Sequence, residues 1–222
     1  LDEYFPAITA DDQTFYYTRN DRTSEVALQE DFLVSQKIND QWQPAQLVKG
    51  VNTNGNEGAP AISADGSLLF YVACAEDRDA HYLGGRKGFG SCDIFYSEKN
   101  GNNWGPCFNL GPVVNTSSFE SQPSFSADGK TLYFVSTRPG GYGRGDIYYT
   151  TLMPDGSWGA PVNLGGIINT DLDEESVYIH PDGKTLYFSS RGHEGMGGLD
   201  IFVSRMDTTG KWGEPQNLGY PI

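Results

Sequence analysis

Acidic residues recur at fixed spacing along this chain and are the residues best suited to chemistry. In four segments a glutamate precedes an aspartate by eight residues. The four pairs are Glu3/Asp11, Glu57/Asp65, Glu120/Asp128 and Glu174/Asp182. Carboxylates brought together from separate segments could act as the acid and base of glycoside hydrolysis. A ring of them could instead attract a cation or a basic segment of a partner.

Other catalytic chemistry has little support in the sequence. The three histidines, His81, His180 and His193, do not occur at metal-ligand spacing. There is no Gly-x-Ser-x-Gly nucleophile motif, and the glycine-rich segment 140–145 lacks the Lys-Ser/Thr that follows a phosphate-binding loop. We therefore expect no catalytic residues, no metal and no cofactor, and we expect that the chain is not an enzyme.

The acidic pairs belong to a repeated unit that must position them. A second block of each unit begins with an aspartate and two apolar residues, at Asp31, Asp93, Asp146 and Asp200. A third block begins at the four tryptophans, Trp42, Trp104, Trp158 and Trp212, which are 62, 54 and 54 residues apart. Three blocks in the same order in four copies indicate a repeat architecture.

Each unit predicts four short antiparallel strands joined by Gly-containing turns. In the third unit the strands are expected around 123–126, 131–136, 146–152 and 161–164. A repeat of about 54 residues with four strands is typical of a β-propeller blade. We therefore predict an all-β fold, a β-propeller of four-stranded antiparallel blades. A two-sheet sandwich is the alternative, but it gives no reason for the period.

The junctions between units set the expected blade boundaries. Three of them share an aliphatic-Asn-Thr-x-x-x-Glu link, at residues 51–57, 114–120 and 168–174. The whole chain, 1–222, is then one propeller region with blades of about 1–50, 51–113, 114–167 and 168–222. No strand from one end of the chain is offset to complete the blade at the other end and so close a ring. We therefore expect these four blades to be part of a larger propeller.

Charge and hydropathy exclude two classes of partner. The 222 residues carry a formal net charge of −14, so nucleic acid and anionic membrane surfaces would be repelled. No apolar run approaches the roughly 18–20 residues needed to span a bilayer. We expect neither nucleic-acid binding nor direct membrane insertion.

The repeat motifs resemble the WD40-like β-propeller repeats related to the TolB propeller. The shared pattern is Pro-x-aromatic/aliphatic-Ser-x-Asp-Gly, an apolar strand, and Asp-Ile-Tyr. The segments beginning at Arg138 and Gly195 are also similar to envelope proteins of the OmpA family. These proteins combine tetratricopeptide repeats, such a propeller and an OmpA-like domain, and they include an outer-membrane lipoprotein of the type IX secretion machinery.

The resemblance implies a location and a class of partner. It places the chain in the periplasm, associated with the outer membrane, as a scaffold for envelope or secretion-machinery proteins. Peptidoglycan would be contacted only through the OmpA-like domain, which is absent from this chain.

In TolB-like blades the first strand is innermost, so Glu3, Glu57, Glu120 and Glu174 would lie together at one end of the central channel. We call these four residues the acidic rim. One interpretation is structural, with Arg–Asp or Glu–backbone bonds that fix the loops of each blade. The other is functional, with an acidic rim that binds a basic segment of a partner or a cation.

The second unit contains an insertion. Asp65 and Asp93 are separated by 28 positions, where the equivalent aspartates of the third and fourth units are separated by 18. Cys74 and Cys92 flank the insertion at the ends of two adjacent strands, and we predict that they form a disulfide. A Cys92–Cys107 pair is the alternative.

The inserted loop is a candidate partner contact because insertions in repeats map to loops, and loops often carry binding residues. The residues concerned are Arg78, His81, Tyr82, Arg86 and Lys87. A merely lengthened surface loop is the alternative. The function predicted from the sequence is a non-catalytic protein-interaction or scaffold module, and the alternative is a glycan-binding or glycan-hydrolysing propeller enzyme.

Overall fold

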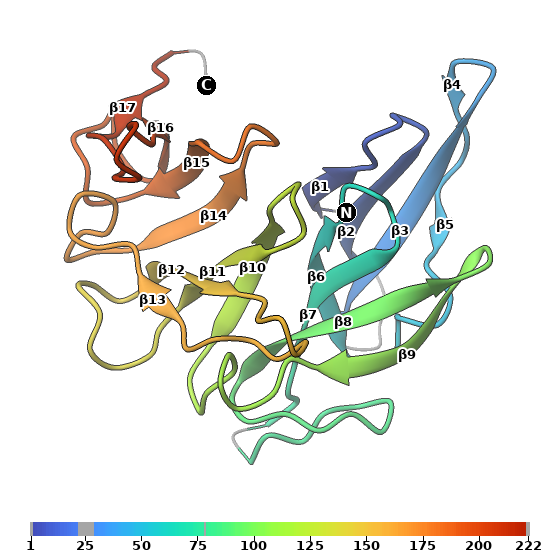
Figure 1. Cartoon of the computed structure of the whole chain (residues 1–222). Helices are drawn as coiled ribbons and strands as arrows, with labels where there is room; N and C mark the ends of the chain where they lie inside the picture. The colour runs from blue at the N-terminus through green and yellow to red at the C-terminus, as the bar shows by residue number, and fades with distance from the viewer. Residues whose placement is uncertain (1, 22–28, 78, 221–222) are drawn as a thin grey trace.

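The computed structural model describes residues 2–21, 29–77 and 79–220, and the regular structure in these ranges is entirely β-strand. The strands form four antiparallel sheets arranged as a four-bladed propeller (Figure 1). This confirms the predicted all-β propeller of four-stranded antiparallel blades. Within the described residues, no helix is long and apolar enough to cross a bilayer.

Each blade is a meander of strands in sequence order. The first contains β1 (Asp2–Ile8), β2 (Thr14–Asp21) and β3 (Gln29–Ile38), with β4 (Gln41–Trp42) and β5 (Gln46–Leu47) both paired to β3. The second contains β6 (Asn56–Ile62), β7 (Leu68–Cys74), β8 (Cys92–Asn100) and β9 (Asn103–Asn109). The third contains β10 (Glu120–Phe125), β11 (Thr131–Ser136), β12 (Asp146–Thr151) and β13 (Val162–Asn163). The fourth contains β14 (Glu174–Ile179), β15 (Thr185–Ser190), β16 (Asp200–Arg205) and β17 (Gln216–Asn217).

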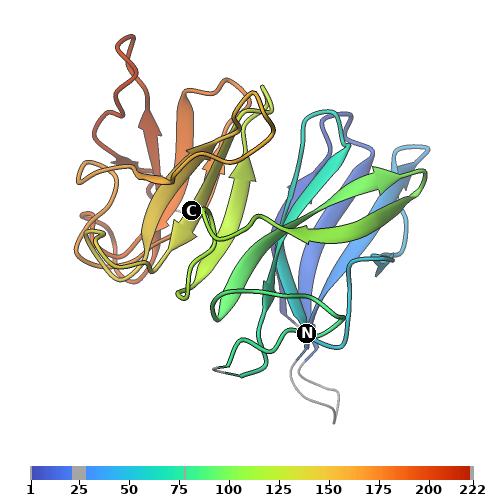
Figure 2. The same cartoon turned by 60° about the horizontal axis from the view of Figure 1, so that its bottom comes forward.

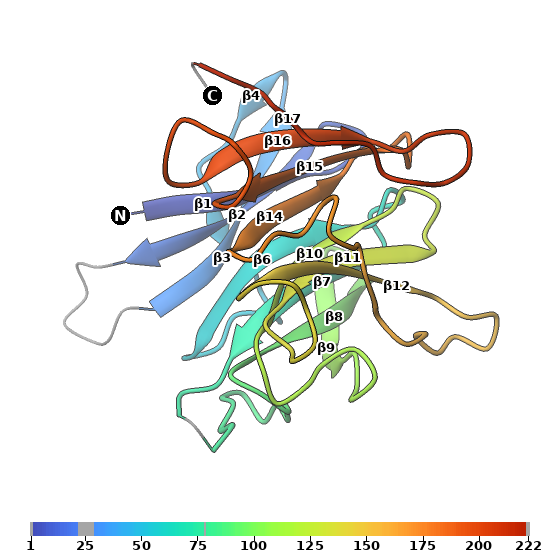
Figure 3. The same ribbon diagram turned by 90° about the vertical axis from the view of Figure 1, so that its left-hand side faces the viewer.

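The first strand of each blade contacts the first strand of the next. β6 packs against both β1 and β10, and β10 packs against β14 (Figure 3). Each of these inner strands has a register shift with a non-glycine residue at positive φ. The four residues are Phe5 (51°), Ala59 (53°), Gln122 (53°) and Ser176 (54°). The bulge therefore recurs at one position of the repeat, where it turns the inner strand at the centre of the molecule.

The blades are joined by aromatic side chains that recur at the same positions. Trp104 of the second blade packs on Tyr16 of the first, with ring centres 6.2 Å apart. The equivalent pairs are Trp158 on Phe70 at 6.1 Å and Trp212 on Tyr133 at 6.4 Å. Burial of such rings supplies most of the stabilisation between sheets.

Trp42 of the first blade differs from the other three tryptophans. It packs on Phe15 of its own blade and remains 43% exposed. The same tryptophan position therefore joins two blades in three units and covers its own sheet in the first.

Cys74 and Cys92 form a disulfide at the end of β7 and the start of β8, where the two residues face each other in the ladder. The predicted pairing is confirmed, and Cys107 is a free, half-buried cysteine. The bond closes the base of the inserted loop, which extends from the second blade (Figure 2).

Candidate functional site

Three of the four rim glutamates lie in the interior. Glu57, Glu120 and Glu174 are each at most 1% exposed. The Glu120 carboxylate accepts hydrogen bonds from the backbone N–H of Thr116 at 2.6 Å and from its hydroxyl at 2.8 Å. The same two bonds join Glu57 to Thr53 and Glu174 to Thr170. In these blades the glutamate closes the Asn-Thr link that precedes it.

The asparagine of each link ties it to the third strand of the preceding blade. Asn115 accepts a hydrogen bond from the backbone N–H of Ile94 at 2.9 Å and donates one to its carbonyl at 2.9 Å. The equivalent pairs are Asn52 with Phe32 and Asn169 with Ile147. Because both bonds are to main-chain groups, the side chain takes the place of a neighbouring strand.

An arginine reaches this arrangement from the loop after the second strand of the third blade. Arg138 donates through Nη2 to the Val114 carbonyl at 2.6 Å and to the Glu120 carboxylate at 3.3 Å. Its guanidinium lies 5.3 Å from the ring centre of Phe134 and 5.0 Å from that of Tyr148. Burial lowers the pKa of Arg138. The glutamate charge is thus paired, as a buried charge requires.

Other side chains occupy the position of Arg138 in the second and fourth blades. Arg86 of the inserted loop contacts the Glu57 carboxylate and the Val51 carbonyl, and its guanidinium lies over Tyr71 and Phe95. In the fourth blade Nε2 of His193 is 2.8 Å from the Ile168 carbonyl, and its ring packs beside Phe188 and Phe202. We call each set of link Asn and Thr, glutamate, and Arg or His a joint.

The aspartates that begin the third strands hold the loops beside the joints. The Asp146 carboxylate accepts hydrogen bonds from the backbone N–H groups of Tyr142 at 2.7 Å and Gly143 at 3.1 Å. Asp93 does the same for Phe89 and Gly90, and Asp200 for Met196 and Gly197. The Glu–backbone network of the structural interpretation is therefore present, and the arginines of the second and third joints pair with glutamate rather than with these aspartates.

The first blade keeps its rim glutamate accessible. Glu3 pairs with Arg19 at 2.6 Å, and its side chain is 50% exposed. Nearby, burial and then the charge of Glu57 raise the pKa of Asp31. Binding of a partner or cation by the acidic rim stays a prediction, and Glu3 is the rim glutamate with the exposed carboxylate.

The inserted loop divides into buried and exposed residues. Tyr82 is 8% exposed, packs on Phe95 and donates its hydroxyl to the Gly90 carbonyl. Arg86 is buried in its joint, so these two predicted partner contacts are used inside the chain. His81 and Lys87 are exposed, and a hydrogen bond with Asp77 raises the pKa of His81. Arg78 lies outside the described residues.

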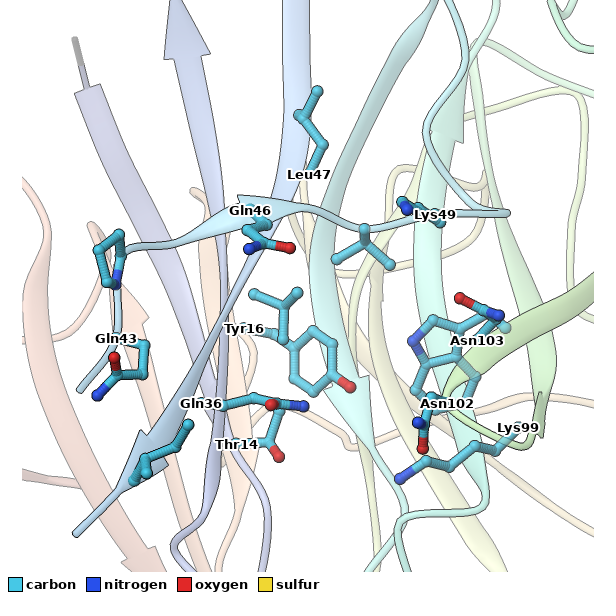
Figure 4. Close-up of a pocket in the computed structure, with 15 residues that line it drawn as sticks. Thr14, Tyr16, Gln36, Gln43, Gln46, Leu47, Lys49, Lys99, Asn102 and Asn103 are labelled. Atoms are coloured by element: carbon cyan, nitrogen blue, oxygen red, sulfur yellow. The ribbon is translucent and has the colours of Figure 1, made fainter. Parts of the chain in front are cut away.

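A groove between the first and second blades was not predicted from the sequence. It opens at the opposite end of the blades from the joints and has a volume of about 530 Å³ (Figure 4). Its lining includes Gln36, Lys49, Lys99 and Asn102, above Tyr16. These polar residues belong to no repeat motif, and their departure from the repeat was the signal that could have revealed them.

The equivalent groove between the second and third blades has a different lining. Its volume is about 700 Å³, and it contains the aromatic residues Phe70, Tyr96 and Trp158. The charged residues that line it are Asp65, Glu98 and Asp128. The two grooves share their aromatic framework and differ in the sign of their charge.

Comparison with known proteins gives similarity in structure alone. No model of a protein family matches the sequence, and no curated protein matches it. TolB from Acinetobacter baumannii superposes with a TM-score of 0.61 at 17% identity, over 98% of this chain and 43% of that chain. The chain described here therefore spans less than half the length of that TolB. The fold is that of a TolB-like propeller.

Glycoside hydrolases are similar to the same degree. An α-L-arabinofuranosidase from Lactobacillus brevis has a TM-score of 0.59 at 12% identity, over 98% of this chain and 78% of that chain. An endo-arabinase from Bacteroides thetaiotaomicron has a TM-score of 0.58 at 16% identity, over 97% of this chain and 80% of that chain.

These enzymes correct one expectation. We inferred from the missing catalytic motifs that the chain is not an enzyme. That inference was wrong, because several solved proteins with this fold are glycoside hydrolases. The physical reason is that glycoside hydrolysis by two carboxylates needs neither a histidine nor a nucleophile motif. The similarity supports a TolB-like propeller and gives no support to the OmpA-family or type IX secretion part of the resemblance.

Proposed function

We propose that this propeller is a protein-interaction or scaffold module of a periplasmic envelope protein, associated with the outer membrane and related to type IX secretion. The TolB-like fold and the Cys74–Cys92 disulfide support an oxidising location such as the periplasm. Envelope or secretion-machinery proteins are the proposed partners.

The observation that carries this proposal is the construction of the inserted loop. Its base is closed by the disulfide, and its interior face is fixed by Tyr82 and Arg86. This leaves His81, Lys87 and Phe89 exposed, with Phe89 at 43%. A segment fixed by Tyr82 and Arg86 loses little entropy when it binds, which favours a specific protein contact.

The test is capture of envelope proteins by the full chain and by a His81→Ala/Lys87→Glu/Phe89→Ala variant. The matched control is Tyr142→Ala, which removes an exposed aromatic ring at the position of Phe89 in the third blade. We expect the loop variant to lose its captured proteins and the control to retain them. Equal capture by both variants would contradict the proposed contact.

A second candidate function, glycan binding or hydrolysis, is supported by the glycoside hydrolases that share the fold. It is tested by incubating the chain with arabinan and measuring reducing ends. Release that is abolished by Glu3→Gln would support hydrolysis at the acidic rim, and no release would contradict hydrolysis of this polymer.

A further inference from the structure

The groove between the first and second blades is built from parts of both sheets. The start of β2, the end of β3 and the segment 43–49 form one wall, and the turn between β8 and β9 forms the other. Tyr16 and Trp104 lie at its base, as Figure 4 shows for Tyr16. Its volume of about 530 Å³ is in the range of sites that hold small ligands.

The equivalent groove shows which of these residues packing requires. Both grooves have an aromatic residue on the second strand and a tryptophan from the next blade, Tyr16 with Trp104 and Phe70 with Trp158. The remaining lining is not shared, and Gln36 occupies the position of Glu98 in the other groove. The polar side chains of the first groove are therefore not needed to join two blades.

These side chains have polar groups free for a ligand. Six polar side chains of the lining make no hydrogen bond to other residues within the described ranges. These are the side chains of Gln36, Gln46, Lys49, Lys99, Asn102 and Asn103. Four amides and two ammonium groups thus face one cavity with their donors uncommitted. Such a set can bind several hydroxyl groups and an anion together.

The charge of the lining is the opposite of the charge of the chain. The whole chain has a net charge of −14, yet the groove is lined by Lys49 and Lys99 and by no carboxylate. Asp11 lies close enough to Lys99 to feel its charge but is outside the lining. At physiological salt, charges farther than about 8 Å are largely screened, so a bound anion would respond to the two lysines of the lining and to Asp11 beside Lys99.

We propose that this groove binds an acidic saccharide, a short glycan that carries a carboxylate. The two lysines would pair with the carboxylate, and the amides would donate to and accept from the sugar hydroxyls. The cavity is much larger than a single inorganic anion requires, and its many amides suit a ligand with several hydroxyl groups. This site is separate from the inserted loop, which lies at the joint end of the blades.

The test is titration of trigalacturonic acid into the full chain. Binding is monitored by calorimetry and by the NMR signals of the tryptophan indole N–H groups. Its methyl ester, an acidic tripeptide (tri-aspartate) and sulfate are the comparison probes. The groove variant is Lys49→Gln/Lys99→Gln. The matched control is Lys130→Gln/Lys184→Gln, which removes two exposed lysines from other blades.

We expect trigalacturonic acid to bind, the groove variant to bind it about tenfold more weakly, and the control to bind as the unchanged chain does. The methyl ester should bind weakly to both. No binding of trigalacturonic acid, equal binding by the two variants, or tighter binding of tri-aspartate or sulfate would each overturn the proposal.

Discussion

The two ends of the blades use their polar residues in opposite ways. At the joints, the side chains of Glu120, Thr116 and Asn115 are all hydrogen-bonded within the chain and buried or half-buried. In the groove at the other end, Gln36 and Lys49 face a cavity without such partners in the described residues. The residues that form the three joints hold the blades together, and those that depart from the repeat are the candidates for recognition.

The largest expected effect is at a joint. Changing Glu120→Ala removes the acceptor of Thr116 and leaves the largely buried guanidinium of Arg138 without its carboxylate. We expect the free energy of unfolding to fall by about 4 kcal/mol, as for other buried ion pairs that lose one partner. Urea unfolding measures the change.

Glu3→Ala is the matched control for this joint, because Glu3 pairs with Arg19 at the surface. Its effect should be below about 1 kcal/mol. Equal losses in the two variants would show that the buried joints are not the source of stability.

The disulfide at the base of the inserted loop should have the next largest effect. A Cys74→Ser/Cys92→Ser variant opens a closed segment with a sequence separation of 18. The expected loss is about 3 kcal/mol from the added freedom of the unfolded chain. Cys107→Ser is the control. A thermal unfolding midpoint as low as that of the double variant would contradict a stabilising role for the disulfide.

The link asparagines are expected to contribute less. Asn115→Ala leaves the buried N–H of Ile94 without a partner, although its carbonyl keeps the bond from the Leu110 N–H, and this should cost about 2 kcal/mol. Hydrogen exchange of the Ile94 amide should increase, while Ile147, held by Asn169, should stay protected. Unchanged protection at Ile94 would mean that the asparagine does not replace a strand.

The smallest expected effect is at the turn between β6 and β7. Hydrogen bonds from Ser63 and Ser67 lower the pKa of Asp65 to about 2. A carboxylate with a lowered pKa stabilises the folded chain above its unfolded pKa of about 4, and this contribution is lost as the pH falls towards 2.

The matching variant is Asp65→Asn, and urea unfolding midpoints measured across that pH range check the prediction. Because Asp65 is exposed, the effect should be small. The variant should show a weaker dependence on pH between about 4 and 2 than the unchanged chain. An identical pH dependence would contradict the proposed role of this turn.

The repeat made most of the fold predictable. The spacing of the acidic, Asp and Trp blocks predicted four strands in each blade, and the insertion between Cys74 and Cys92 predicted the disulfide. The repeat could not show that Arg86 would take the place of Arg138, because the two lie at different distances from their strands. That substitution depends on how the inserted loop folds back over Tyr71 and Phe95.

The departure of the groove residues from the repeat marks them as candidates, but the sequence could not show that they form one groove. Lys49 and Lys99 are 50 residues apart and come together only because two blades pack face to face. Repetition predicts what the units share, whereas these features arise where one unit differs from the next.

The most direct test of this division of roles is the affinity for trigalacturonic acid, measured on the Lys49→Gln/Lys99→Gln and Glu120→Ala variants under conditions where both are folded. We predict that the groove variant binds about tenfold more weakly and that the joint variant, although less stable, binds as the unchanged chain does. A joint variant that loses affinity while the groove variant keeps it would contradict the account.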